Sequence, residues 1–160
     1  MLKKLLLLIF LGLSLTTSIS YAQTPSQAEI AQWRTYAQKG NSDAQYNLGV
    51  LYDQGWGVKQ NDATAAKWYE KAAKQGDTKA QFNLGNMYYE GRGVKQNKTT
   101  AAKWFEKAAK QGHVRSQSRL GFMYEWGEGV KRDLKKAKSL YKQACDGGFE
   151  GACRAYRLTS

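Results

Sequence analysis

Small and apolar residues recur along this chain at helical spacing, and glycines interrupt the pattern at regular intervals. In segment 62–75, Ala65, Trp68, Tyr69 and Ala72 stand at positions i, i+3, i+4 and i+7, which places them on one face of an α-helix. Small alanines alternate with large aromatic rings on this face, so neighbouring helices can interdigitate there. The pattern predicts a helix that is buried along one side.

A second helix is predicted just before it, over 42–54. Its small and apolar residues lie mostly on one stripe; they are Ala44, Leu48, Val50, Leu51 and Tyr52. Gly49 lies inside this helix, where glycine costs roughly 1 kcal/mol relative to alanine. We therefore expect a partner helix to approach the chain closely at Gly49.

Glycines and polar residues mark the ends of both helices. Gly55 and Gly57 can take the positive φ that a helix C-terminus requires, and Asn61 is suited to cap the N-terminus of the following helix. The equivalent N-caps in the later units are Asn97 and Asp133. Each unit is therefore predicted to be a pair of antiparallel helices.

The whole pattern returns with a period of 36 residues. Segment 44–79 matches segment 80–115 at 24 of 36 positions, far above coincidence. Such a period is typical of stacked helical arrays, which bind partners along one surface more often than they catalyse reactions. The predicted organisation is a signal peptide at 1–22, an N-terminal capping helix at 23–40, repeats at 41–76, 77–112 and 113–148, and a C-terminal capping helix at 149–160.

The first 22 residues are typical of a cleaved export signal. Two lysines give a basic start, the apolar run 5–15 is short for a membrane span, and Ser20-Tyr21-Ala22 predicts cleavage after Ala22. An uncleaved membrane anchor is the alternative interpretation. Cleavage would place the remaining chain in the periplasm or outside the cell, with no membrane span.

The chain is strongly basic. Its formal net charge is +12, and removal of Lys3 and Lys4 with the signal leaves +10. Such a balance draws a protein to anionic surfaces and acidic proteins. Nucleic acid is not expected as a partner, because an exported protein rarely meets it and the sequence has no nucleic-acid-binding motif. A solvated lysine surface that only favours solubility is the simpler explanation of the charge.

The repeat also carries a specific motif. In the first unit its residues are Ala44, Leu48, Gly49, Tyr52, Gly55, Gly57, Val58, Ala65, Trp68, Tyr69, Ala72 and Gly76. This motif strongly resembles that of the Sel-one-like repeat (SLR) family, which is related to the tetratricopeptide repeats, and the match covers about residues 41–158. The resemblance implies an all-α fold, a right-handed α/α superhelix (solenoid), and a role as an adaptor or scaffold.

Both cysteines, Cys145 and Cys153, lie near the C-terminus. An even count in an exported chain predicts one disulfide, and the glycine-rich segment between the two suits a clip across a helical turn. The pair also resembles one in a cysteine-rich branch of secreted bacterial SLR proteins, some of which are described as binding or hydrolysing β-lactams. That branch has the pair in every unit, whereas here only the last unit has it.

No catalytic constellation is visible in the sequence. The single histidine, His113, occupies the turn position that Asn41 and Asp77 hold in the other units, and we expect it to start a helix. One histidine cannot form a multi-histidine metal site, and Gly55-x-Gly57 lacks the remaining residues of a phosphate-binding loop. The sequence therefore predicts no catalytic residue, no cofactor and no metal.

The candidate binding surface is the concave face of the superhelix. In tetratricopeptide-like arrays the first helix of each unit lines this groove, and we expect those of its residues that are not used for packing to face a partner. They are Tyr46, Asn47, Val50 and Asp53 in unit one, Phe82, Asn83, Asn86 and Tyr89 in unit two, and Ser118, Arg119, Phe122 and Glu125 in unit three.

Three of these residues have chemistry suited to a peptide. Asn47 and Asn83 resemble groove asparagines with which related repeats grip a peptide backbone or carboxylate, since an amide both donates and accepts hydrogen bonds. Arg119 suits an acidic group. The units diverge at several of the groove positions, which is expected at a binding surface and equally at any unconstrained surface.

Three functions remain in competition. The first is a non-catalytic, monomeric adaptor that binds a protein or peptide partner of acidic character in the groove. The second is a weak hydrolase of β-lactams or cell-wall fragments, which rests on the cysteine resemblance alone. The third is attraction to an anionic envelope polymer through lysines on the convex side, namely Lys67, Lys71, Lys74, Lys103, Lys107 and Lys110.

Overall fold

The structure is a computed structural model that describes residues 24–159, so the predicted signal peptide lies outside the described residues. Within this range the chain forms eight α-helices and no strand. The helices are α1 (Gln27–Gln38), α2 (Ser42–Gln54), α3 (Asp62–Lys74), α4 (Thr78–Glu90), α5 (Lys98–Lys110), α6 (Val114–Trp126), α7 (Leu134–Asp146) and α8 (Glu150–Leu158). None of these helices has the length and apolar character needed to cross a membrane.

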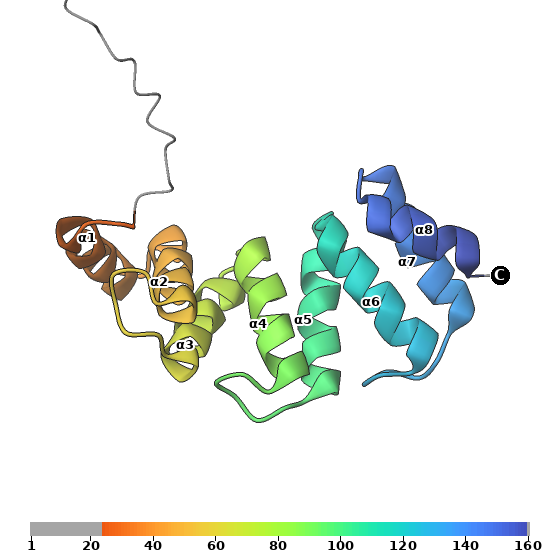
Figure 1. Cartoon of the computed structure of the whole chain (residues 1–160), viewed down its shortest axis with the longest axis horizontal. Helices are drawn as coiled ribbons and strands as arrows, with labels where there is room; N and C mark the ends of the chain where they lie inside the picture. The colour runs from red at the N-terminus through yellow and green to blue at the C-terminus, as the bar shows by residue number, and fades with distance from the viewer. Residues whose placement is uncertain (1–23, 160) are drawn as a thin grey trace, which may run out of the picture.

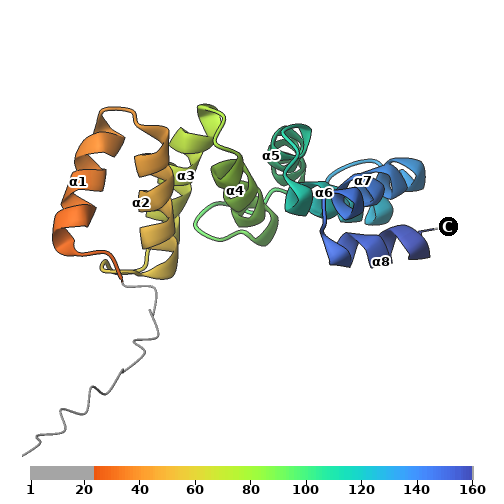
Figure 2. The same cartoon turned by 90° about the horizontal axis from the view of Figure 1, so that it is seen from above.

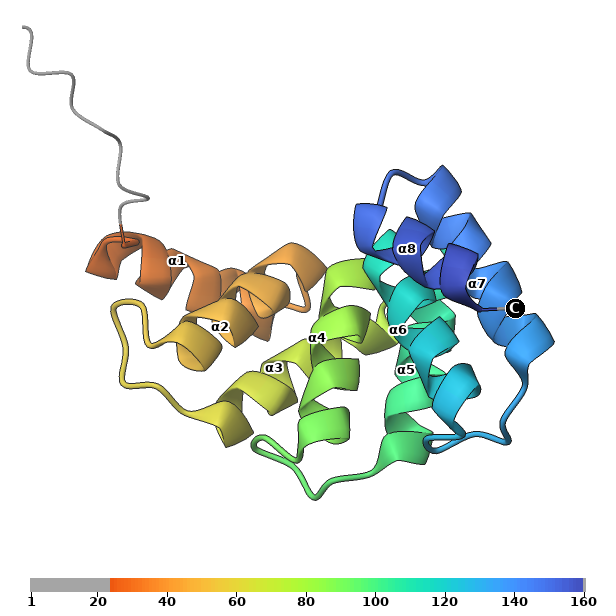
Figure 3. The same ribbon diagram turned by 45° about the vertical axis from the view of Figure 1, so that its right-hand side comes forward.

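The helices follow one another in chain order from one end of the molecule to the other (Figure 1). Each helix packs mainly against its neighbours in sequence, and α2 also contacts α4. The pairs α2/α3, α4/α5 and α6/α7 form three helical hairpins that stack side by side in a curved row (Figures 2 and 3). The fold is the predicted α/α solenoid.

The predicted helix caps are present. The side chain of Asn61 accepts a hydrogen bond from the backbone N–H of Thr64 at 2.9 Å, and Asn97 and Asp133 make the equivalent bond in the next two hairpins. Gly55 ends α2 with a left-handed backbone, at φ 73°. These local signals explain why the predicted helices 42–54 and 62–75 agree closely with α2 and α3.

The close approach expected at Gly49 is confirmed. A Cβ atom on Gly49 would lie 2.4 Å from Cδ1 of Tyr69, whose ring is fully buried between α2 and α3. Gly85 and Phe105 repeat the arrangement in the second hairpin, with a closest distance of 2.6 Å. Glycine is needed at this position of the first helix because the aromatic ring of the second helix fills the space that a Cβ atom would occupy.

Glutamines join the helices within a hairpin and tie each hairpin to the preceding helix; Gln45, Gln81 and Gln117 are the buried members. Gln45 Nε2 donates to the carbonyl oxygen of Ala37 at 3.0 Å, and Gln75 Nε2 donates to Gln45 Oε1 at 2.7 Å. Gln81 and Gln111 make the corresponding two bonds one unit later. We call this set of bonds the glutamine ladder.

The glutamine ladder stops at the last hairpin. Gln117 donates to the carbonyl oxygen of Ala109 at 3.2 Å, but Gly147 stands where Gln75 and Gln111 stand in the earlier units. Gln117 Oε1 is consequently buried with no hydrogen-bond partner among residues 24–159. The end of the array lacks a contact that its interior has.

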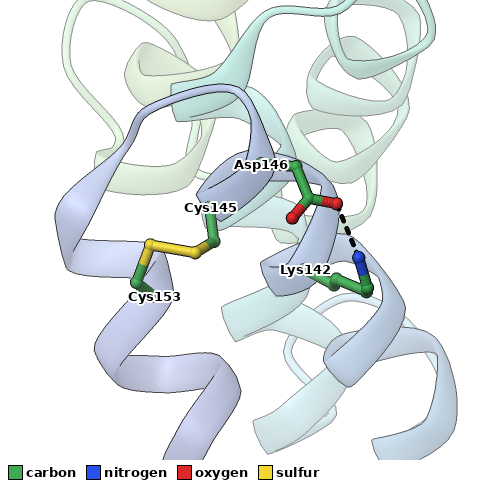
Figure 4. Close-up of a disulfide and its surroundings, with 4 residues drawn as sticks. All are labelled: Lys142, Cys145, Asp146 and Cys153. Atoms are coloured by element: carbon green, nitrogen blue, oxygen red, sulfur yellow. Dashed lines mark hydrogen bonds and ion pairs between the residues drawn. A yellow bond between two sulfur atoms is a disulfide. The ribbon is translucent and has the colours of Figure 1, made fainter.

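The predicted disulfide is present at this same end. Cys145 in the last turn of α7 is bonded to Cys153 in α8, across a sequence separation of eight residues (Figure 4). Helix α8 has nine residues and packs on α7, and its N-cap residue, Phe149, makes no side-chain hydrogen bond that caps it. The disulfide therefore adds a covalent link to a terminal helix that packs mainly on one neighbour, α7.

Candidate functional site

Four hollows follow one another along one face of the helix row. Their volumes are about 570, 500, 330 and 400 Å³ from the N-terminal to the C-terminal end. Asn47 lines the first and second, Tyr46 and Lys79 line the second and third, and Phe82 and Arg115 line the third and fourth. Because each hollow shares a wall with the next, they form one groove, built mostly from α2, α4 and α6.

Most of the predicted groove residues line these hollows. They are Tyr46, Asn47, Val50, Phe82, Asn83, Ser118, Arg119 and Phe122. The other four, Asp53, Asn86, Tyr89 and Glu125, do not line them. Asn86 Oδ1 is buried with no hydrogen-bond partner among the described residues.

Asp53, expected to be free of packing, is in fact part of the packing. The residue is only 8% exposed, and its carboxylate accepts hydrogen bonds from the Tyr69 hydroxyl at 3.2 Å and from Arg92 Nη1 at 2.7 Å. Burial raises the pKa of the Tyr69 hydroxyl far above its ordinary value, so it remains a donor. The expectation for Asp53 was wrong, because this carboxylate joins α3 to the turn of the next unit.

The residues equivalent to Asp53 are also bonded within the fold. The Glu125 carboxylate accepts from the Tyr141 hydroxyl at 2.7 Å, whereas Tyr89 donates its hydroxyl to Glu128. In this unit Phe105 stands at the position of Tyr69 and has no hydroxyl to donate. An acid is thus present where the facing ring has a hydroxyl, and a tyrosine is present where it has none. Internal pairing explains the divergence of the units at this position.

The structure also adds groove residues that sequence reasoning missed. Trp33 comes from α1 and Trp56 from the turn after α2, and both line the first hollow. Asp43, Lys79 and Arg115 occupy the first turns of α2, α4 and α6 and also line the groove. These three stand one period apart in the sequence, so an alignment of the repeats could have identified them as groove residues.

The charge of the groove changes sign along its length. Glu29 lines the first hollow, and two acids, Asp43 and Asp77, line the second together with one cation, Lys79. Arg115 and Arg119 line the fourth. The C-terminal half of the groove therefore attracts carboxylates, whereas the N-terminal half does not.

His113 starts a helix, as predicted. Its Nδ1 accepts a hydrogen bond from the backbone N–H of Ser116 at 3.3 Å and lies 2.8 Å from the Ser116 hydroxyl oxygen. This pair is not a catalytic dyad, because Ser116 is fully buried and cannot reach a substrate. Burial, together with the nearby positive charge of Arg115, lowers the pKa of the His113 ring.

Acidification should weaken the fold through His113. The lowered pKa means that the unfolded chain takes up the proton more readily than the folded chain, so stability falls as the pH drops below about 6.5. A protonated Nδ1 also loses its role as a helix-cap acceptor. We expect His113→Asn, which installs the residue found at position 41, to reduce the loss of stability between about pH 7 and pH 5. Urea unfolding of both proteins at several pH values measures this, and identical pH profiles would contradict it.

Most of the lysines that were predicted for the convex side contact a neighbouring side chain. Lys74 pairs with Glu70 at 2.8 Å, and Lys71 lies over the Trp68 ring, 4.3 Å from its centroid. The second hairpin repeats both contacts with Lys110 and Lys107. Only the first lysine of each set of three, Lys67 and Lys103, has no such contact among the described residues.

Within residues 24–159, no group of three or more His, Cys, Asp or Glu side chains is placed to hold a metal ion.

The repeat units match a known family. A model of the Sel1 repeat matches residues 42–77, 78–113 and 114–149. The chain belongs to the Sel1 repeat family. This finding confirms the resemblance drawn from the sequence motif, and Sel1 repeats commonly mediate interactions between proteins.

Solved structures of other Sel1 repeat proteins share the fold. A Sel1 repeat protein from Oxalobacter formigenes is 38% identical with a TM-score of 0.80, over 86% of this chain and 56% of its own. The protective antigen c5321 of uropathogenic Escherichia coli, which displays an SLR fold, is 38% identical with a TM-score of 0.78, over 79% of this chain and 27% of its own. Cysteine rich protein B of Helicobacter pylori also shares the fold. It is 24% identical with a TM-score of 0.61, over 79% of this chain and 96% of its own.

This Sel1 repeat protein therefore spans 56% and 27% of the length of the first two structures. No curated protein sequence matches the chain.

Proposed function

We propose that this Sel1 repeat protein is an exported, non-catalytic adaptor that binds a protein or peptide partner in its groove. The continuous groove carries the proposal: four hollows with shared walls run along α2, α4 and α6. Such a surface suits an extended chain segment, since solenoids present long concave faces to their partners. The disulfide between Cys145 and Cys153 supports export, because disulfides persist in oxidising compartments.

The groove amides supply contacts for a peptide backbone. Asn47 lines the first and second hollows, and Asn83 lines the third, one repeat further along. Each amide can donate to a backbone carbonyl and accept from a backbone N–H of the same segment. Tyr46 and Phe82, at the preceding position of each repeat, provide apolar surface for its side chains.

No geometric observation favours the hydrolase alternative. The one histidine–serine contact, between His113 and Ser116, is buried and serves as a helix cap. We therefore expect purified protein to hydrolyse a chromogenic β-lactam no faster than a heat-killed control. Hydrolysis above that control would replace the adaptor function with the enzymatic one.

Site-specific photo-crosslinking tests the groove. A photo-reactive amino acid at position 118 lines the fourth hollow, whereas one at position 103 is exposed outside the four hollows and serves as the matched control. In envelope extracts of the producing cells, we expect crosslinked partners from position 118 but not from position 103. The triple variant Asn47→Ala/Asn83→Ala/Arg119→Ala should weaken those crosslinks. Equal crosslinking from both positions, or an unaffected triple variant, would remove the groove from the proposal.

A further inference from the structure

The C-terminal hollow of the groove differs in chemistry from the other three. Phe82 of α4, Phe122 of α6 and Phe149 at the start of α8 line its volume of about 400 Å³. Two guanidinium side chains, Arg115 and Arg119, share the same hollow. It therefore offers an apolar surface together with two cationic groups, each able to bind a carboxylate.

The two arginines have no carboxylate partner in the part of the chain that the structure describes. None of the ion pairs within residues 24–159 involves Arg115 or Arg119. Arg92 provides the contrast, because it pairs with Asp53 at 2.7 Å and with Glu90 at 2.8 Å. Arg92 thus serves the fold, whereas Arg115 and Arg119 form no ion pair within it. The Glu128 carboxylate, which feels the charge of Arg119, is bound by Lys98 and by the Tyr89 hydroxyl.

Arg119 is also held in place. Its guanidinium lies over the Tyr89 ring, 5.5 Å from the centroid. Stacking on an aromatic face orients the planar group and leaves its N–H edges able to donate hydrogen bonds. A carboxylate that binds there encounters a side chain that needs little reorganisation.

We propose that this hollow binds an acidic peptide segment that carries an aromatic side chain. The aromatic ring packs against Phe82, Phe122 and Phe149, and carboxylates one or two residues away pair with Arg115 and Arg119. Aromatic packing accounts for the apolar wall, and the two ion pairs account for the unpaired arginines. The inference rests on the proposed groove function and specifies the chemistry of the partner segment.

The disulfide controls one wall of this site. Phe149 is the N-cap residue of α8 and Ala155 lies within it, and Cys153 of this helix is bonded to Cys145. The other walls come from α4, α6 and α7, within the stacked hairpins. Breaking the disulfide therefore loosens one side of the pocket and weakens binding, while the rest of the array stays in place.

Fluorescence anisotropy with defined peptides tests the site. The probe is a fluorescein-labelled, amidated peptide of sequence Gly-Ser-Asp-Phe-Asp-Ser-Gly. One control peptide has asparagine in place of both aspartates, and another has alanine in place of phenylalanine. We expect wild-type protein to bind the probe saturably and each control peptide about tenfold more weakly or worse, since each lacks one of the two contact types.

Matched protein variants separate local recognition from overall charge. Arg115→Gln/Arg119→Gln should weaken binding about tenfold or more, whereas Lys67→Gln/Lys103→Gln, which removes the same charge from the convex side, should change it less than about twofold. Cys145→Ser/Cys153→Ser and Phe149→Ala should both weaken binding, and the second does so with the disulfide intact. Circular dichroism and thermal unfolding verify that each variant is folded.

Three results would overturn the inference. They are the absence of saturable binding to wild-type protein, equal binding of the probe and the asparagine peptide, and equal losses in the arginine and lysine variants. Crosslinking at position 118 distinguishes the two proposals. If it captures a groove partner while the probe fails, the groove function stands and only this partner chemistry is wrong. If both fail, the groove function falls as well.

Discussion

Gly93→Ala should unfold the array under conditions in which Gly76→Ala leaves it folded. Both glycines have positive φ values, +67° for Gly93 and +98° for Gly76, so alanine costs about 1–2 kcal/mol of backbone strain at either position. A Cβ on Gly93 would lie 2.3 Å from the backbone carbonyl carbon and oxygen of Asp62, whereas nothing lies within 4 Å of one on Gly76. Backbone atoms cannot rotate away as a side chain can. We expect Gly93→Ala to cost roughly 3 kcal/mol or more in total.

Urea or thermal unfolding followed by circular dichroism gives the two free energies. Gly76→Ala serves as the control, because it has the same backbone requirement without the steric conflict. The contact involved is between units: the turn after α4 lies against the start of α3 in the preceding hairpin. Equal losses of stability in the two variants would show that this contact does not hold the hairpins together.

Reduction of the Cys145–Cys153 disulfide should release α8 and leave the first two hairpins nearly unchanged. The bond closes a short loop, which contributes about 2–3 kcal/mol in the chain-entropy model. Without it, α8 is a nine-residue helix with no side-chain N-cap bond, and helices of this length are marginal alone. Hydrogen exchange should therefore rise in residues 147–159 and stay the same in residues 44–110.

The variant Cys145→Ser/Cys153→Ser provides the control, because it breaks the bond without adding reductant. It should reproduce the exchange pattern of the reduced protein. An increase spread evenly over all three hairpins would mean that the disulfide stabilises the array as a whole. Free thiols in protein isolated from its natural compartment would show that the bond does not form there.

Sequence reasoning succeeded where the responsible contacts lie within one repeat. The N-cap at Asn61 acts on Thr64, three residues later, and Gly49 meets Tyr69 of the same hairpin. Both signals recur with the period, so the sequence displays them several times. The fold class and the helix positions follow from such local and repeated features.

Contacts between repeats were harder to foresee. Asp53 pairs with Arg92 at a sequence separation of 39, and no pattern in one unit predicts that bond. Asp53 therefore looked like a free groove residue when only its place on the helix face was known. The role of Phe149 was equally hidden, because it depends on how α8 folds back beside the last hairpin. Arg115, in contrast, could have been found, since it stands one period after Lys79.

The glutamine ladder allows the gene to grow by duplication. Its bonds join residues 8 or 30 apart in sequence, for example Gln45 with Ala37 and Gln75 with Gln45. Both separations are shorter than one repeat, so a copied segment of 36 codons brings its own partners and meets the same ones on either side. An insertion within this region whose length is not a multiple of 36 residues would separate at least one pair. Whole-unit copying thus lengthens the groove without rebuilding an existing junction, as long as the copy is placed ahead of Gly147 and the disulfide-linked last helix.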